Sequence, residues 1–237
     1  MKKNIYKNLY SDQNNLGNLA KNPRIQSMLE IINRANPKDK NILDIGCYDG
    51  TFLSLIKNRN NNFFGLEASD WGAEKARQKG IEVNQYFFNG SAGLPYEDEF
   101  FDVITAGEIV EHIFDTDFFL EEIARALKPG GKFLLSTPNI ASFGRRLLLL
   151  AGKNPIIEIS PNESDSSGHI RYFTFKTLKD ILGKHKFEII LSRSDYVNFS
   201  KNGKIRSVFL AKIFPRTGTS IICYAKKTSR KTEKLAG

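Results

Sequence analysis

The chain of 237 residues has few cysteines and no long apolar run. Its two cysteines, Cys47 and Cys223, are too few for a disulfide framework and show no CxxC spacing, which argues against a secreted scaffold and against a zinc site. The basic N-terminus is not followed by an apolar stretch, and no segment approaches the ~20 apolar residues of a membrane span. We therefore expect a soluble protein in the reducing environment of the cytoplasm.

Acidic residues are scarce near the C-terminus. Residues 200–237 hold ten Lys or Arg and one acid, Glu233, so this segment alone carries a charge of +9, equal to that of the whole chain. An excess of this kind can mark an anionic partner such as nucleic acid, a phosphorylated sugar or a membrane surface. We favour the simpler interpretation, in which 227–237 is a solvated basic tail.

Short apolar segments alternate with amphipathic ones along the first part of the chain. With 41% apolar residues the chain can bury one substantial core, so we expect a single domain over 1–237. The expected strands are 41–45, 63–66, 83–88, 101–105 and 132–136, and the expected helices are 24–35, 51–59, 70–79 and 116–127. Strands separated by helices form a parallel sheet with right-handed crossovers. The fold class is therefore α/β, with a Rossmann-like, doubly wound sheet after an N-terminal helical segment over 1–40.

The pattern changes after Pro138. Segments 186–192 and 219–226 follow one another without a crossover helix of the earlier kind, so we expect them to pair as antiparallel strands at one edge. The whole sheet would be mostly parallel and seven-stranded, with an antiparallel edge strand. A helix over 175–184 is expected to begin after Thr174, whose hydroxyl is a suitable N-cap.

Two segments would then be insertions on the substrate side, 140–170 and 195–217. In the first, apolar residues between Asn139 and Gly152 predict a helix that packs over the site as a lid. In the second, 205–214 combines a basic and an apolar face and could touch a membrane surface. Packing of 205–214 against the edge strands is the more frequent explanation of such a pattern.

A glycine-containing turn follows the first expected strand. Gly46 and Gly50 stand in this turn, where the backbone of a doubly wound sheet can approach a ligand. Glu67 lies 21 residues after Gly46, at the end of the second strand, where an acid can accept hydrogen bonds from both ribose hydroxyls. This pattern indicates adenosine, and fits an adenosyl sulfonium about as well as NAD. Because Tyr48 stands at the second glycine position of GxGxxG, and no second catalytic domain is present, a dinucleotide is disfavoured.

The segment 42–50, Ile-Leu-Asp-Ile-Gly-Cys-Tyr-Asp-Gly, resembles the first motif of the class I S-adenosylmethionine-dependent methyltransferases. Later segments resemble, in the same order, motifs of the small-molecule branch of this family, which includes the O-methyltransferases of the ubiquinone pathway. These segments are Leu94-Pro95-Tyr96, Phe101-Asp102-Val103-Ile104, Glu108-Ile109-Val110-Glu111-His112, Leu127-Lys128-Pro129-Gly130-Gly131 and Ser136-Thr137-Pro138-Asn139. The resemblance covers roughly residues 24–192 and implies a methyltransferase with S-adenosylmethionine as cofactor.

The same resemblance implies which residues bind the cofactor. Asp44 and the loop after it would hold the methionine end, Glu67 the ribose and Ala68 the edge of the adenine. The full set that we assign to the cofactor is Asp44, Gly46, Cys47, Tyr48, Asp49, Gly50, Glu67, Ala68, Asn89, Gly107 and Glu108.

Two positions in this set depart from the family pattern. Tyr48 replaces a common glycine, so we expect the loop backbone to be rearranged there. Asn89 stands where an acid usually follows the third strand. Its amide oxygen can still accept a hydrogen bond from the adenine amine, so we expect weaker or differently posed binding.

Two histidines are the candidate catalytic residues. Methyl transfer to a hydroxyl benefits from a general base, and imidazole titrates nearest to neutral pH. His112 and His169 both lie on segments that should project from the carboxyl ends of the strands. A structural or cofactor-side role is the alternative for His112, and a helix anchor is the alternative for His169. His185 is expected at the surface.

Glu108, Glu111, His112 and His169 also resemble the set that holds magnesium in small-RNA 3′-terminal 2′-O-methyltransferases. Such groups can coordinate divalent ions. However, the same spacing occurs in relatives without a known metal, and we expect none here. The leading hypothesis is O-methylation of a small molecule or of a glycan-linked or lipid-linked precursor. The alternatives are metal-assisted methylation of RNA, which we do not favour, and a non-catalytic adenosyl-binding module.

Overall fold

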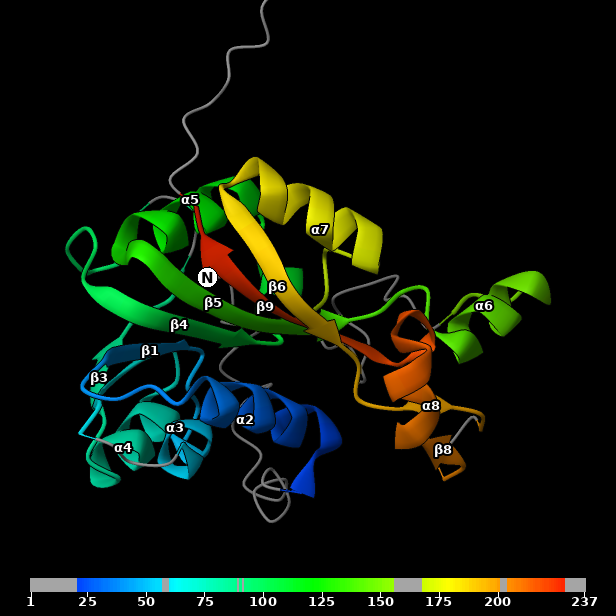
Figure 1. The fold of residues 1–237 in the computed structure, drawn as a ribbon, viewed down its shortest axis with the longest axis horizontal. Coiled ribbons are helices and arrows are strands. Elements are labelled where there is room, and N and C mark those ends of the chain that lie inside the picture. The colour runs from blue at the N-terminus through cyan, green and yellow to red at the C-terminus, as the bar shows by residue number, and fades with distance from the viewer. Residues whose placement is uncertain are drawn as a thin grey trace, which may run out of the picture.

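The computed structural model describes residues 21–56, 60–88, 90, 92–155, 168–200 and 204–228. Its centre is a seven-stranded sheet with the strand order β3-β2-β1-β4-β5-β9-β6 (Figure 1). The strands are β1 (Asn41–Ile45), β2 (Asn62–Glu67), β3 (Glu82–Gln85), β4 (Phe101–Gly107), β5 (Leu127–Pro138), β6 (Phe187–Arg193) and β9 (Ser220–Lys227). Each predicted strand is therefore present; β1 has the predicted bounds, and the ends of the other strands are shifted.

The sheet is parallel except for β9, which runs antiparallel to both of its neighbours, β5 and β6. The predicted seven-stranded, mostly parallel α/β sheet is confirmed, and so is the antiparallel pairing of its last two strands. The antiparallel strand is not itself the edge, however. Because the chain returns through β9 between β5 and β6, β6 becomes the edge strand.

Helices cover both faces of the sheet. On one face lie α2 (Pro23–Ala35), α3 (Thr51–Leu55) and α4 (Asp70–Gln78), and on the other lie α5 (Thr116–Ala126) and α7 (Phe175–Lys184) (Figure 1). One cluster of buried apolar side chains lies under each helical layer, as a sheet buried on both faces requires. The strands at the centre of the sheet are therefore packed against apolar side chains on both faces.

Local capping explains where two of these helices begin. The Asn22 side chain accepts a hydrogen bond from the backbone of Arg24, and Pro23 occupies the first helical position of α2. The Thr174 hydroxyl accepts a hydrogen bond from the backbone of Thr177, so the predicted N-cap of α7 is confirmed.

Three expectations are wrong. The helix expected over 51–59 ends at Leu55, which is 39% exposed. His185 is buried rather than at the surface, and its Nε2 lies 2.6 Å from the Asp117 carboxylate of α5. Helix α6 (Phe143–Leu150) buries none of its residues and therefore is not a packed lid.

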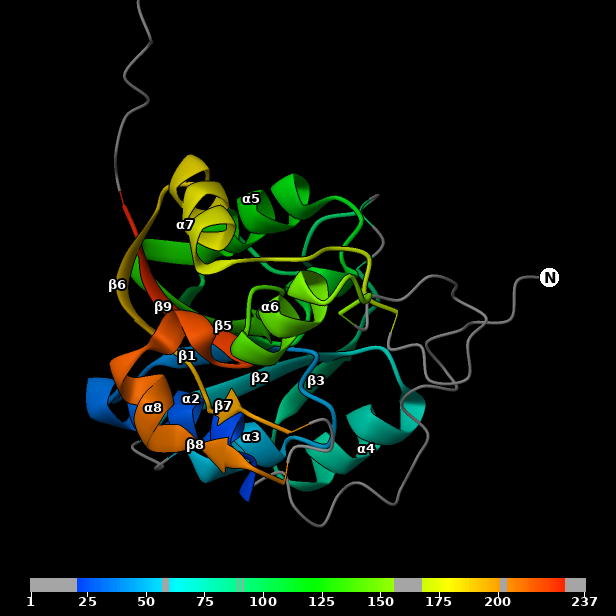
Figure 2. The same ribbon diagram turned by 90° about the vertical axis from the view of Figure 1, so that its right-hand side faces the viewer.

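The two expected insertions carry short elements at one end of the sheet. Besides α6, they hold β7 (Val197–Asn198), β8 (Arg206–Ser207), α8 (Val208–Ile213) and η3 (Pro215–Thr217). Figures 1 and 2 both show α6 and α8 at the end of the sheet where β5 finishes. No described helix is long and apolar enough to cross a bilayer.

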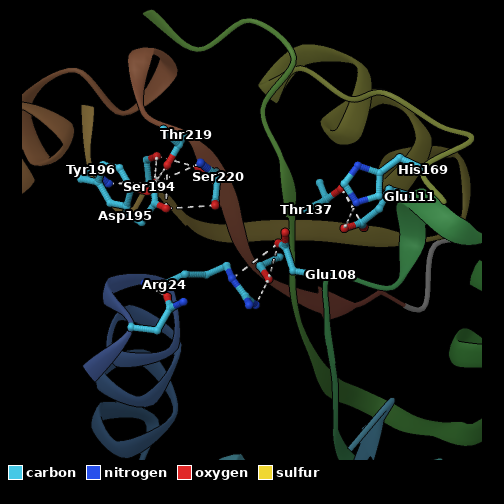
Figure 3. Close-up of polar contacts among 12 residues, drawn as sticks. Arg24, Glu108, Glu111, Thr137, His169, Ser194, Asp195, Tyr196, Thr219 and Ser220 are labelled. Carbon is cyan, nitrogen blue, oxygen red and sulfur yellow. Dashed lines mark hydrogen bonds and ion pairs between the residues drawn. The ribbon is translucent and has the colours of Figure 1, made fainter. Parts of the chain in front are cut away.

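Buried polar groups attach these elements to the sheet. The amide of Asn139 donates hydrogen bonds to the carbonyls of Arg216 (3.1 Å) and Gly218 (2.9 Å). The buried carboxylate of Asp195 accepts hydrogen bonds from five donors: the hydroxyls of Ser194, Thr219 and Ser220 and the backbone amides of Tyr196 and Ser220 (Figure 3).

We predict that Asp195→Ala lowers the free energy of unfolding by roughly 3 kcal/mol, because it leaves several buried donors without an acceptor. Urea denaturation monitored by circular dichroism measures the change. Asp180→Ala is the control, since Asp180 forms an exposed ion pair with Lys176, and its loss should cost less than about 0.5 kcal/mol. Equal stabilities of the two variants would contradict the prediction.

Candidate functional site

The site lies where the chain changes direction within the sheet. β1 and β4 are neighbours, although β2 and β3 lie between them in the sequence. The loops that follow β1 and β4 therefore diverge, and a doubly wound sheet binds its ligand in the crevice between such loops. A cavity of about 530 Å³ occupies this position, lined by the loop after β1, the ends of β2 and β4, and part of α2.

The loop after β1 bends through three residues with positive φ. Gly46 and Gly50 have φ of +73° and +76°, and a Cβ at Gly46 would lie 2.4 Å from the Ile109 side chain. Tyr48 adopts φ of 49°, the region that glycine usually occupies. The tyrosine has therefore not shifted the backbone away from a left-handed conformation, and its ring packs beside Trp71, with centroids 5.3 Å apart.

Glu67, at the end of β2, is held by two loops. Its Oε2 accepts a hydrogen bond from the Tyr48 amide (2.9 Å), and its Oε1 accepts one from the Ser69 amide (2.8 Å). Each carboxylate oxygen has about two acceptor positions. The Glu67 side chain, which lines the cavity, can therefore accept one further hydrogen bond on each oxygen, a pattern that fits a vicinal diol.

Asp44 is a buried carboxyl group on the cavity wall. Burial raises its pKa to about 7, while the hydrogen bond that the Thr105 hydroxyl donates to it (2.6 Å) acts in the opposite direction. The nearby Glu67 carboxylate also raises this pKa. A cationic ligand in the cavity would favour the ionised form of Asp44.

Two further residues of the expected cofactor loop, Cys47 and Asp49, have side chains that are buried or bound to other residues of the protein. The Asp49 carboxylate accepts hydrogen bonds from the Thr51 backbone and hydroxyl and pairs with Lys79 at 2.7 Å, which with the Thr51 bonds keeps its pKa below its usual range despite burial. Burial raises the pKa of the Cys47 thiol far above its usual range. Both residues line the cavity. We expect a ligand to contact mainly their backbone, because their side chains are occupied within the protein.

A second group of polar residues lies beyond the end of β4, in η2 (Val110–His112) and in the segment before α7. The backbone amides of Ile170 and Arg171 both donate to the Glu111 carbonyl, at 2.9 and 3.0 Å. These bonds bring His169 beside η2, and the ring centroids of His112 and His169 lie 4.8 Å apart. His112 Nδ1 lies 3.1 Å from the Gly168 carbonyl, which can only accept, so Nδ1 carries the proton in the neutral ring.

Glu111 is the buried acid of this group. It is 1% exposed, and its Oε2 accepts a hydrogen bond from the Thr137 hydroxyl at 3.0 Å. Its Oε1 has no hydrogen-bond partner among the described residues and lies 3.9 Å from His169 Nε2 (Figure 3). Burial and the neighbouring Glu108 carboxylate raise the pKa of Glu111 to about 8.

Glu108 is engaged outside this group. Its Oε1 accepts a hydrogen bond from the Ser136 hydroxyl (3.1 Å) and lies 3.7 Å from Arg24 Nε (Figure 3). The possible metal ligands therefore reduce, within the described part of the chain, to Glu111, His112 and His169, whose ligand atoms lie within 4.8 Å of one another.

The structure brings most of the predicted site residues to one cavity. Gly50 shapes the turn without lining the cavity, His169 stands outside the lining, and Asn89 is not among the described residues. The predicted residues that line it are Asp44, Gly46, Cys47, Tyr48, Asp49, Glu67, Ala68, Gly107, Glu108 and His112.

Sequence reasoning missed several lining residues. Arg24 and Met28 come from α2, and Phe87, which is 49% exposed, follows β3. A motif around the strand ends gives no signal for α2, because its place over the cavity depends on packing against β5 and β9. The aromatic run at 86–88 was the one available signal, since aromatic side chains are frequent at ligand cavities.

Comparisons with known proteins agree with this geometry. Residues 21–192 match the model of a family described as "Methyltransferase domain". A ubiquinone biosynthesis O-methyltransferase of Chelativorans sp. is 35% identical over 102 residues, which are 41% of this chain and 40% of that protein. One from Coxiella burnetii is 27% identical over 179 residues, or 68% of this chain and 76% of that protein. The chain thus spans only about two fifths of the first of these relatives.

A solved structure from Thermotoga maritima shares the fold. It is described as an SAM-dependent methyltransferase and possible histamine N-methyltransferase, and it superposes with a TM-score of 0.61 at 21% identity, covering 86% of this chain and 89% of that one. At this level of identity the likeness establishes the fold and leaves the reaction open.

We predict that Asp44→Asn stabilises the protein without ligand, and increasingly so as the pH rises. The folded chain keeps the Asp44 proton up to about pH 7, whereas the unfolded chain loses it near pH 4, so ionisation of Asp44 disfavours folding between these values. The stability difference between variant and parent should grow by about 1.4 kcal/mol per pH unit in that window.

Urea titrations at several pH values measure this difference. Glu74→Gln removes an exposed carboxylate on α4 and should leave the difference flat. A difference for Asp44→Asn that does not change with pH would show that burial does not hold the proton on Asp44.

Proposed function

The chain belongs to the methyltransferase-domain family, and we propose that it transfers a methyl group from S-adenosylmethionine to a hydroxyl oxygen of its acceptor. It is an S-adenosylmethionine-dependent methyltransferase. The acceptor that we propose is a small molecule or a glycan-linked or lipid-linked precursor. We propose oxygen as the methylated atom because a pair of histidines and a buried acid, Glu111, lie beside the crevice, where they could remove a proton from a hydroxyl.

The cavity has the groups that this cofactor needs. S-adenosylmethionine supplies a methyl group already activated by its sulfonium, so the protein has mainly to bind, orient and exclude water. The two remaining acceptor positions of Glu67 fit the ribose diol, and Asp44 fits the ammonium of the methionine part. The positive φ values at Gly46, Tyr48 and Gly50 turn the loop backbone around the methionine end.

We assign the proton transfer to His169, with His112 beside it. The acceptor hydroxyl would lose its proton to an imidazole nitrogen as the new C–O bond forms and the C–S bond breaks, with its electron pair going to sulfur. Glu111 Oε1 lies 3.9 Å from His169 Nε2. An imidazolium at that distance favours the ionised form of Glu111, and the ionised acid in turn stabilises the imidazolium.

Metal-assisted methylation of RNA is the second candidate. The donor set of Glu111, His112 and His169 suits a divalent ion, and Glu111 Oε1 lacks a hydrogen-bond partner in the described chain. One observation weighs against it. Glu108, the fourth member of the set that resembles the magnesium site, is engaged by Arg24 and Ser136.

We predict that Glu67→Ala weakens binding of S-adenosylhomocysteine by tenfold to a hundredfold, on the order of two charge-assisted hydrogen bonds, as isothermal titration would measure. Because Glu67 also holds two loops, the melting temperature of the variant is compared with that of the parent. Glu74→Ala, which removes an exposed acid from α4, should bind as the parent does. Absence of heat from the parent with both S-adenosylmethionine and S-adenosylhomocysteine would refute the cofactor site.

We predict that His169→Ala lowers methyl transfer by about a hundredfold or more and leaves S-adenosylhomocysteine affinity unchanged, because the imidazole acts on the acceptor alone. Transfer is followed with a radiolabelled methyl donor and fractionated cell extract, which also isolates the acceptor. Lys176→Ala, an exposed change on α7, is the control and should retain full activity.

The same assay separates the two candidates. The metal-free reaction should survive EDTA and label an extract fraction that resists ribonuclease. Loss of transfer in EDTA, its restoration by Mg²⁺ and a labelled RNA would contradict the proposal and favour the second candidate.

A further inference from the structure

One end of the molecule exposes an unusual number of large apolar side chains. In the described chain, nine of the fifteen exposed large apolar residues lie on α6, on α8 and the residue after it, or directly beside β7 and β8. They are Leu147, Leu149, Leu150, Phe199, Ile205, Val208, Phe209, Ile213 and Phe214. We call these elements, together with η3, the apolar–basic surface. Exposed apolar groups that gather in one region commonly mark an interaction site.

The elements of this surface are attached to one another. The rings of Phe143 in α6 and Phe199 beside β7 have centroids 5.3 Å apart. The Arg146 guanidinium donates to the carbonyl of Arg216 in η3, at 3.2 Å. Figures 1 and 2 show α6 and α8 at the same end of the sheet, and both helices contact β7. Segments that are about 60 residues apart in the sequence thus form one region.

The apolar side chains of α6 and α8 are not buried in the hydrophobic core. Helix α6 buries no residue, and α8 buries only Ala211. Leu150 is 84% exposed and Phe209 is 69% exposed. Helices of this length gain most of their stability from packing an apolar face. These exposed side chains therefore suit a surface that is covered by something outside the described chain.

The charge of the region is of one sign. No Asp or Glu occurs in 139–157 or in 196–227. The exposed cations Arg146, Lys212 and Arg216 form no ion pair within the described residues. Arg206 is also exposed, and its guanidinium lies over the Tyr196 ring, 5.2 Å from the ring centroid.

From this combination we propose that the apolar–basic surface docks on an anionic phospholipid bilayer. Phe, Leu and Ile side chains enter the boundary between headgroups and acyl chains, while Lys and Arg attract anionic headgroups. A second copy of the chain would bring like charges together, which opposes self-association. Nucleic acid would contact the cations but would leave the aliphatic side chains of α6 in water.

The surface adjoins the acceptor side of the site. Asn139 follows β5 and holds η3 through the Arg216 carbonyl, and α6 begins four residues later. Docking would therefore turn the carboxyl ends of the strands toward the bilayer. The inference extends the proposed function, but it does not depend on the reaction, because bilayer binding is measured without methyl transfer.

The test is sedimentation of the full chain with vesicles of phosphatidylcholine alone or with about 30 mol% phosphatidylglycerol. The chain should bind the anionic vesicles, and binding should weaken in about 0.5 M salt as the charges are screened. Phe209→Ser with Phe214→Ser should lower the partition coefficient about tenfold or more, and so should Lys212→Glu with Arg216→Glu.

Matched controls lie elsewhere on the molecule. Ile190→Ser removes an exposed apolar side chain from β6, and Lys75→Glu reverses an exposed charge on α4. Both should bind as the parent does, and all variants should keep the parent's melting temperature. No binding to anionic vesicles, equal binding by all variants, or a concentration-dependent dimer that the Phe209 and Phe214 changes abolish would each overturn the proposal.

Discussion

The hydrogen bonds that the Glu67 carboxylate accepts hold the site together. This carboxylate closes β2 and accepts hydrogen bonds from the amides of Tyr48 and Ser69, so one side chain fixes the loop after β1 and the turn that leads into α4. Because these bonds use only part of its acceptor capacity, the same carboxylate can also bind a ligand diol. In the proposed function, one carboxylate would therefore both hold the two loops in place and bind the ribose of the cofactor.

Two further buried acids give the crevice its chemical character. Asp44 lies on its wall, and Glu111 lies beyond the end of β4, and burial raises the pKa of each. Acids of this kind reduce the stability of the empty protein at neutral pH and are ready to ionise beside a cation. In the proposed function this cation would be the ammonium of the cofactor at Asp44 and an imidazolium at Glu111, and in the second candidate function it would be a metal ion at Glu111.

Much of the fold and of the cofactor crevice follows from local sequence patterns. Apolar strands, glycines in the turn and Glu67 at a fixed spacing lie within one continuous segment, so periodicity and motif spacing predict them. Contacts between distant residues could not be predicted in this way. His185 is buried beside Asp117, and Glu108 contacts Arg24 and Ser136 instead of joining the group of Glu111, His112 and His169. The exposure of α6 likewise depends on which surfaces the sheet leaves available.

A crystal structure of the protein with S-adenosylhomocysteine would show whether Glu67 binds the cofactor. We expect the two oxygens of Glu67 to lie within hydrogen-bond distance of the two ribose hydroxyls, with the bonds from Tyr48 and Ser69 retained and the ligand ammonium beside Asp44. A ligand bound elsewhere, or a crevice filled by protein side chains with Glu67 making no ligand contact, would contradict this expectation.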